Sequence, residues 1–97
     1  MDLVFDPAKN TQNIADRGLS FELAAGFDFA QALIWQDVRQ NYGEARYCAL
    51  GFIGTRVHAL VFTLRANQLR VISLRLANAR ETKKYNQTLA REHIRSK

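Results

Sequence analysis

The sequence is poor in cysteine, proline and histidine, and the shortages of cysteine and histidine exclude a disulfide framework and a standard metal site. Among its 97 residues there are one cysteine, one proline and two histidines. A single cysteine, Cys48, cannot form an intramolecular disulfide, so a disulfide-held secreted scaffold is excluded. Two histidines 35 positions apart, without clustered carboxylates, do not form a standard metal-ligand set. No glycine-rich phosphate loop is present either. We therefore expect no metal and no cofactor.

Long apolar runs, linkers and repeats are missing as well. No apolar run is long enough to span a bilayer, and no charged-then-apolar leader opens the sequence. These features predict a cytoplasmic protein that does not contact membranes. No Pro/Gly/Ser-rich segment divides the chain, and its length is that of one domain. We therefore predict a single domain over residues 1–97.

The charge, by contrast, is abundant and unevenly distributed. Residues 1–64 hold five Lys/Arg and seven Asp/Glu, a net −2, whereas residues 65–97 hold nine against two, a net +7. Such asymmetry predicts an anionic partner for the last third of the chain, either nucleic acid or an acidic protein segment. A solvated basic face is the other interpretation.

Helix signals mark the first third of the sequence. After a short strand over residues 3–5, Asp6 is suited to cap a helix and Pro7 to occupy its first position. Gly18 is suited to end that helix. Ser20 is suited to cap a second, shorter one, which we expect to bring three side chains to the core: Phe21, Ala24 and Ala25.

From residue 32 the pattern becomes that of strands. We predict strands over residues 32–38, 46–53, 56–65 and 69–76, and their short connections favour an antiparallel arrangement. Apolar residues occupy both alternating sets in 57–64, so the middle of the sheet is expected to be covered on both faces.

A final helix is predicted from Asn78 to about Arg95. Asn78 and Glu81 have the spacing of a capping box, and the apolar stripe is thin. That stripe consists of Tyr85, Leu89 and Ile94. The whole order is β-α-α-β-β-β-β-α, which is an α+β domain.

The two-residue period of a strand separates the arginines of residues 69–76. Without a bulge, Ser73 and Arg75 share one face, and Arg70 lies on the other with Ile72 and Leu74. We therefore expect Arg70 and Arg75 to have different tasks. For Arg70 we predict a structural pair with Glu81 or Glu44.

Several short stretches together resemble a known family. They are "FDPAKN", "RGLSFELA", "YGEARYCALG", "VFTLR" and "RVISLRLANARETKKY", in order over residues 5–85. The chain resembles BrnT-type toxins of bacterial type II toxin–antitoxin systems. The resemblance implies a RelE-like fold and ribonuclease activity. It also implies a partner antitoxin with a ribbon-helix-helix domain, which links the toxin indirectly to operator DNA. Two positions depart from the family pattern: Arg17 replaces a usual histidine, and Thr82 a common arginine.

RNA cleavage asks little of the protein, since the neighbouring 2′-oxygen of the substrate attacks the phosphorus. Fixed guanidinium groups suit the stabilisation of the extra phosphoryl charge. We predict Arg75 and Arg80 as the phosphate-facing pair, with Arg46 beside Arg75 across the sheet. His58 is a candidate general acid or base. Candidate RNA-binding residues are Arg65, Lys83 and Lys84.

Structural interpretations remain open for these same residues. Arg75 is equally suited to a structural ion pair, Arg46 to a pair with Glu44, and His58 to a surface or edge position. Glu81 is a candidate base as well as a cap. Tyr85 is a core residue or a proton donor. At the level of function, the alternative to a ribonuclease is a non-catalytic nucleic-acid-binding or corepressor module.

Overall fold

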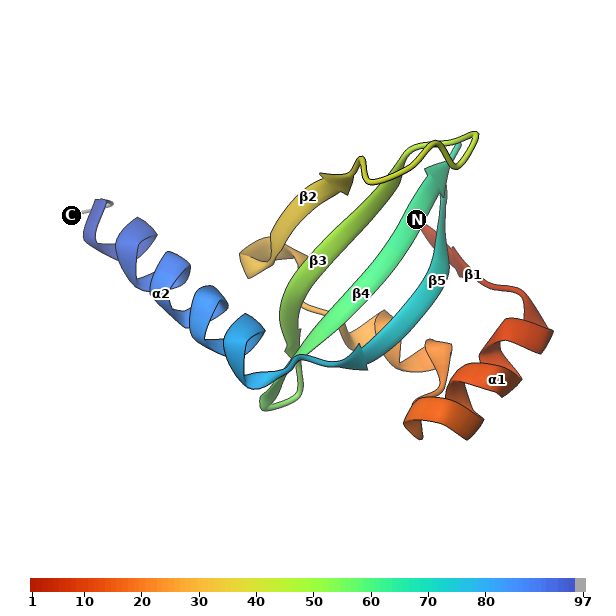
Figure 1. Cartoon of the computed structure of the whole chain (residues 1–97), viewed down its shortest axis with the longest axis horizontal. Helices are drawn as coiled ribbons and strands as arrows, with labels where there is room; N and C mark the ends of the chain where they lie inside the picture. The colour runs from red at the N-terminus through yellow and green to blue at the C-terminus, as the bar shows by residue number, and fades with distance from the viewer. Residues whose placement is uncertain (96–97) are drawn as a thin grey trace.

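A five-stranded sheet organises the chain in the computed structural model, which describes residues 1–95 and the side chains as far as Arg91 (Figure 1). The strands lie in the order β1-β5-β4-β3-β2. Their bounds are β1 (Asp2–Val4), β2 (Leu33–Asp37), β3 (Arg46–Ile53), β4 (Arg56–Arg65) and β5 (Gln68–Leu76). The predicted α+β class and element order are confirmed. The strands β2 to β5 are antiparallel neighbours, as expected, but β1 pairs in parallel with β5. The parallel pairing of this first strand was not predicted.

The predicted signals begin and end α1 (Pro7–Arg17). Asp6 Oδ1 accepts a hydrogen bond from Ala8 N at 2.9 Å. At the other end Gly18 has a φ of 71°, where a side chain would be strained, and its N–H donates to Ile14 O. Both boundaries were thus readable from local sequence, because capping depends on residues only two to four positions apart.

The segment after Ser20 forms two 3₁₀ helices, η1 (Phe21–Gly26) and η2 (Phe29–Gln31). Ser20 Oγ accepts from Glu22 N, as predicted for a cap. Phe21 and Ala24 are buried as expected, but Ala25 is exposed. The period of three in a 3₁₀ helix explains this correction, since it directs positions 21 and 24 to one side and turns position 25 away.

The two faces of the sheet carry different helices. One side of the sheet packs against η1, and α1 lies on the same side; we call it the α1 face. The hydrophobic core on this face includes Leu60 and Phe62 of β4. The opposite side, the α2 face, presents Ala59 and Val61 and is partly covered by α2 (Ala79–Arg95). The prediction that the middle of the sheet is covered on both faces is confirmed for residues 57–60, which are all buried, whereas Val61 on the α2 face is only partly buried.

Helix α2 is held to the sheet mainly through its first half. Tyr85 is 1% exposed, packs with Leu50, Val57 and Ala59, and donates its hydroxyl to Gln31 O at 2.9 Å. Leu89 packs at the margin of this cluster, and Ile94 lies outside the residues whose side chains are described. Figure 1 shows the last turns of α2 projecting beyond the sheet. The rest of the α2 face is therefore open.

A β-bulge reverses the expected facing of the arginines on β5. Val61 pairs with Ser73, but the next residue, Phe62, pairs with Val71, so Ile72 is an extra residue in the ladder. Arg75 lies opposite Ala59, and Arg70 lies opposite Thr63. Residues 59 and 63 share one face of β4, so both arginines lie on the α2 face. The prediction that Arg70 and Arg75 occupy opposite faces was wrong.

Candidate functional site

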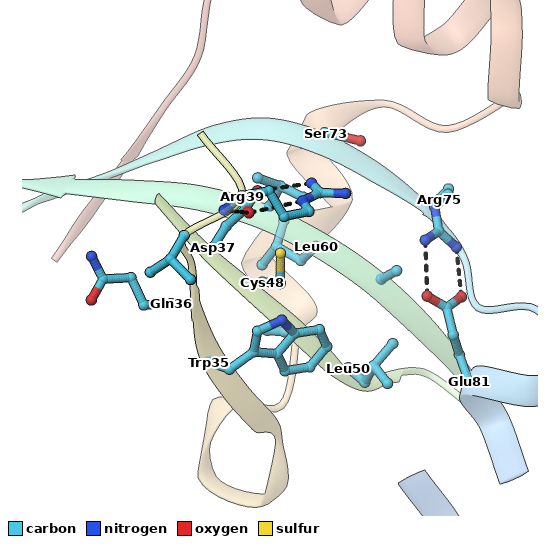
Figure 2. Close-up of a pocket in the computed structure, with 14 residues that line it drawn as sticks. Trp35, Gln36, Asp37, Arg39, Cys48, Leu50, Leu60, Ser73, Arg75 and Glu81 are labelled. Atoms are coloured by element: carbon cyan, nitrogen blue, oxygen red, sulfur yellow. Dashed lines mark hydrogen bonds and ion pairs between the residues drawn. The ribbon is translucent and has the colours of Figure 1, made fainter. Parts of the chain in front are cut away.

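A pocket of about 350 Å³ lies on the open part of the α2 face (Figure 2). Small side chains on three adjacent strands leave the sheet surface hollow there, namely Cys48, Ala59, Val61 and Ser73. Larger groups from three elements and one loop line its sides: Trp35 from β2, Arg39 from the loop after it, Arg75 at the end of β5 and Glu81 at the start of α2. The sheet therefore provides a shallow floor, and charged or aromatic groups surround it.

Arg75 is fixed at the pocket by Glu81. Its Nη1 donates to Oε1 at 2.7 Å and its Nη2 to Oε2 at 2.9 Å, a two-bond ion pair. The side chains are 33% and 23% exposed, so the pair is only partly in contact with solvent. The hydrogen bonds from Arg75 hold the pKa of Glu81 below its ordinary value, and Glu81 in turn raises the pKa of Arg75. At neutral pH both groups are charged.

Glu81 also begins α2. Its Oε1 accepts from Asn78 N at 3.0 Å, and Asn78 Oδ1 accepts from Glu81 N at 2.8 Å. The predicted capping box is thus confirmed, with asparagine in place of serine or threonine. One carboxylate therefore orients an arginine of the sheet and caps the helix that partly covers the same face.

A second arginine–carboxylate pair lies at the end of β2. Asp37 is 6% exposed; it accepts from Arg39 Nε at 2.9 Å, from Arg39 Nη2 at 2.8 Å and from the Tyr42 hydroxyl at 2.9 Å. The hydrogen bonds from Arg39 hold the pKa of Asp37 far below its ordinary range, against the opposing effect of burial. This pair was not predicted from the sequence. Its signal was a carboxylate two residues after Trp35, on the same strand face, with an arginine two residues later.

Arg46 lies on the α2 face but does not form the pair with Glu44. Its guanidinium is stacked over the Tyr42 ring, 4.1 Å from the centroid, and its Nε is buried without a hydrogen-bond partner among the described residues. Glu44 accepts instead from Arg65, with Nη2 at 2.7 Å and Nε at 3.1 Å. Arg46 and Arg75 share a face with β4 between their strands, but Arg75 is in register with Leu50 through Ala59, four residues along β3 from Arg46. The prediction that the two arginines lie side by side was therefore wrong.

The carboxylates considered as partners of Arg70 are both occupied by other residues. Glu81 binds Arg75 and Glu44 binds Arg65. In the part of the chain that the structure describes, Arg70 forms no ion pair, so its predicted pair was wrong.

The structure separates His58 from the pocket. In the alternation of β4, His58 falls on the same side as Leu60 and Phe62, which is the α1 face. It is 6% exposed, and its Nδ1 is 2.8 Å from Arg56 O. His58 therefore shares no site with Arg75. It is not the surface or edge residue of the alternative interpretation either, because it lies buried on a central strand.

The remaining basic candidates lie on the first turns of α2, outside the lining of the pocket. Arg80 is exposed in the first turn and, within residues 1–95, is not among the pocket's lining residues. Lys83 is exposed, and the ammonium of Lys84 lies 5.1 Å from the centroid of the Trp35 ring. The close partner of Arg75 is thus Glu81 rather than Arg80.

Two further groups bear on the chemistry available. Cys48 is only partly buried, and desolvation raises the pKa of its thiol, which disfavours the nucleophilic thiolate. Among the described residues, no three His, Cys, Asp or Glu side chains are grouped to hold a metal ion. Within the same part of the chain, no helix is long and apolar enough to cross a membrane. The ionised groups that line the pocket are the guanidinium groups of Arg39 and Arg75 and the carboxylates of Asp37 and Glu81.

The fold and pocket define a small α+β protein with fixed arginines on an open sheet face. A family model described as "Ribonuclease toxin, BrnT, of type II toxin-antitoxin system" matches residues 5–81. The match covers most of the chain, from the residue before the Asp6 cap to Glu81. The chain belongs to this family of ribonuclease toxins. A search among curated proteins finds no match.

Proposed function

We propose that this toxin is a metal-independent endoribonuclease of the cytoplasm, with Arg75 as its phosphate-binding group. The observation that carries the proposal is the Arg75 guanidinium, held by two hydrogen bonds at the side of an open pocket. Membership of the BrnT family supports ribonuclease activity. The metal independence and the role of Arg75 are argued from chemistry.

The proposed reaction uses the nucleophile of the substrate itself. The 2′-oxygen loses its proton and bonds to phosphorus, while the bond from phosphorus to the 5′-oxygen breaks and that oxygen takes a proton. Negative charge increases on the phosphoryl oxygens during this exchange. A fixed guanidinium stabilises that charge at every relevant pH, and it does so without reorganising during the reaction.

Arg75 keeps donors for this task while it binds Glu81. A guanidinium has five N–H groups. Two of them bind Glu81 and a third donates to Leu76 O at 3.3 Å, which leaves two for a phosphate. The ion pair thus orients Arg75 without consuming all its hydrogen bonds.

Other cations are proposed to extend the binding surface. Arg46 lies on the same sheet face, and Arg80, Lys83 and Lys84 lie on the first turns of α2. Arg65 is bound to Glu44, at the end of β4. We assign these residues to the attraction and positioning of RNA phosphates. His58 has no part in the proposal, because it lies on the α1 face.

Toxins of this family belong to type II toxin–antitoxin systems, in which a protein antitoxin is the partner of the toxin. We propose that this antitoxin has a ribbon-helix-helix domain and connects the toxin to operator DNA. Binding over the basic α2 face would exclude RNA from the pocket. The charge of residues 65–97, nine basic against two acidic, supports an acidic contact segment on the antitoxin.

A non-catalytic nucleic-acid-binding or corepressor module is the competing function. The Arg75–Glu81 ion pair is also consistent with this competing function, because an arginine with a purely structural role would bind a glutamate in the same way. Induction in cells separates the two. We expect growth arrest and loss of RNA when the toxin is induced alone, and neither when the product of the adjacent gene is induced with it. Harmless induction, together with tight antitoxin binding, would favour the corepressor.

A further inference from the structure

The chain's single tryptophan is exposed at the pocket. Trp35 lies on β2, the edge strand opposite β1, and is 41% exposed. It pairs in register with Cys48, so its side chain lies on the α2 face and lines the pocket. Figure 2 shows the indole beside Cys48, on the sheet that also carries Ser73 and Arg75.

An exposed indole that lines a pocket is accessible to a ligand. A large aromatic side chain stabilises a fold mainly by burial, and an exposed one beside polar groups is characteristic of a binding surface. The floor next to Trp35 consists of small side chains, so the space there is open. The geometry offers a flat apolar surface beside a hollow.

The charged groups around this surface are three cations and two carboxylates, Asp37 and Glu81, so their sum is positive. The ammonium of Lys84 is 5.1 Å from the ring centroid, and Arg39 and Arg75 line the same pocket. An exposed indole beside Lys84, in a pocket with two oriented guanidinium groups, matches a ligand that combines a planar ring with phosphates. Single-stranded nucleic acid has both features, and its unpaired bases are free to stack on aromatic side chains.

We propose that Trp35 is a base-stacking residue, which binds a nucleobase of single-stranded RNA adjacent to the phosphate held by Arg75. This inference rests on the proposed ribonuclease function and names its substrate class. A duplex does not fit, because its bases are already stacked on one another. The toxin therefore selects unpaired RNA.

A purely structural role for Trp35 makes a different prediction. In that case the indole serves to hold Lys84, and with it α2, against the sheet. Removing the ring would then weaken the binding of any polyanion, with or without bases. The comparison between a strand with bases and one without them distinguishes the two roles.

The test uses the full chain and the emission of its single tryptophan, which reports on this position alone. The probe is a short single-stranded RNA with 2′-fluorine in place of each 2′-hydroxyl, so that it lacks the attacking oxygen. Its partner is an abasic strand with the same number of phosphates. Fluorescence anisotropy of an end label measures binding of each strand independently of the indole.

We expect the strand with bases to quench the emission and the abasic strand to leave it unchanged. Trp35→Ala is expected to weaken binding of the strand with bases about tenfold, without effect on the abasic strand. Trp35→Phe restores most of the affinity, since it keeps a stacking face. Lys84→Gln, which removes one charge, weakens both strands alike.

Binding of the strand with bases without quenching, or equal quenching by the abasic strand, would overturn the inference and leave the ribonuclease function intact. Equal loss of affinity for both strands in Trp35→Ala would do the same. Absence of anisotropy change with either strand would remove the proposed function as well. Thermal unfolding of Trp35→Ala and Trp35→Phe shows that each variant is folded.

Discussion

Arg75 and Glu81 join β5 to the first turn of α2 through two hydrogen bonds, of 2.7 and 2.9 Å. The same carboxylate caps the helix through Asn78 N. The position of α2 and the orientation of the proposed phosphate-binding arginine therefore depend on one side chain. This dependence leads to the first prediction.

Glu81→Gln is expected to lower both stability and activity. The variant keeps a side chain that can cap the helix but loses the charge that orients Arg75. We expect the free energy of unfolding to fall by roughly 1 kcal/mol, since the pair is only partly buried. Urea unfolding measures this loss. Glu22→Gln, an exposed glutamate in η1, is the matched control and should unfold like the wild type.

The stabilisation by Glu81 should depend on pH in a defined direction. Arg75 lowers the pKa of this carboxyl in the folded state, so its contribution is complete above the unfolded pKa, ordinarily about 4.3. The contribution is lost as the pH falls through the lower folded value. The difference in unfolding free energy between wild type and Glu81→Gln should therefore be constant near pH 7 and shrink below about pH 4. A difference that grows on acidification would contradict the pairing.

Tyr85 is expected to act as a core residue and not as a proton donor. Its ring is buried and its hydroxyl donates to Gln31 O, and burial raises its pKa above the ordinary value. Tyr85→Phe should cost about 1 kcal/mol of stability and leave the cleavage rate of folded protein unchanged. Tyr85→Ala should cost about 3–5 kcal/mol, because it leaves a cavity under α2. A large rate loss in stable Tyr85→Phe would assign it a chemical role.

His58 is expected to be dispensable for chemistry. It lies on the α1 face with its Nδ1 beside Arg56 O, away from the pocket. His58→Gln should therefore change stability more than it changes the cleavage rate per folded molecule. The measurement is single-turnover cleavage at several pH values, with the folded fraction determined by circular dichroism. A rate loss near 100-fold, typical of a lost general acid or base, would place His58 in the reaction after all.

Local signals in the sequence were sufficient for most of the fold. The caps at Asp6, Gly18 and Asn78 each depend on neighbours within a few positions, and all three were predicted. The bulge at Ile72 was not predictable in the same way. It depends on how β4 and β5 fit together, and one extra residue exchanges the faces of all the residues that follow it.

The pocket was predictable only in part. Arg75 was identified as a pocket residue, but its partner was not. In a strand without a bulge Arg70 and Arg75 lie on opposite faces, so Arg75 was assigned to the phosphate and Glu81 was considered as a partner of Arg70. The pocket's other groups, Trp35, Asp37 and Arg39, come from β2 and the loop after it, three places away from β5 in the sheet. Their approach to Arg75 depends on sheet order and twist, which no short stretch of sequence encodes.

The central claim is that Arg75 stabilises the phosphate during metal-independent cleavage. The most direct measurement is the single-turnover rate of single-stranded RNA cleavage by purified protein in the presence of a chelator. Arg56→Ala, which removes an exposed arginine at the start of β4, serves as the control. We predict wild-type cleavage under these conditions, an unchanged rate for Arg56→Ala, and a loss of about 100-fold or more for folded Arg75→Ala. Cleavage by folded Arg75→Ala at the wild-type rate would contradict the account.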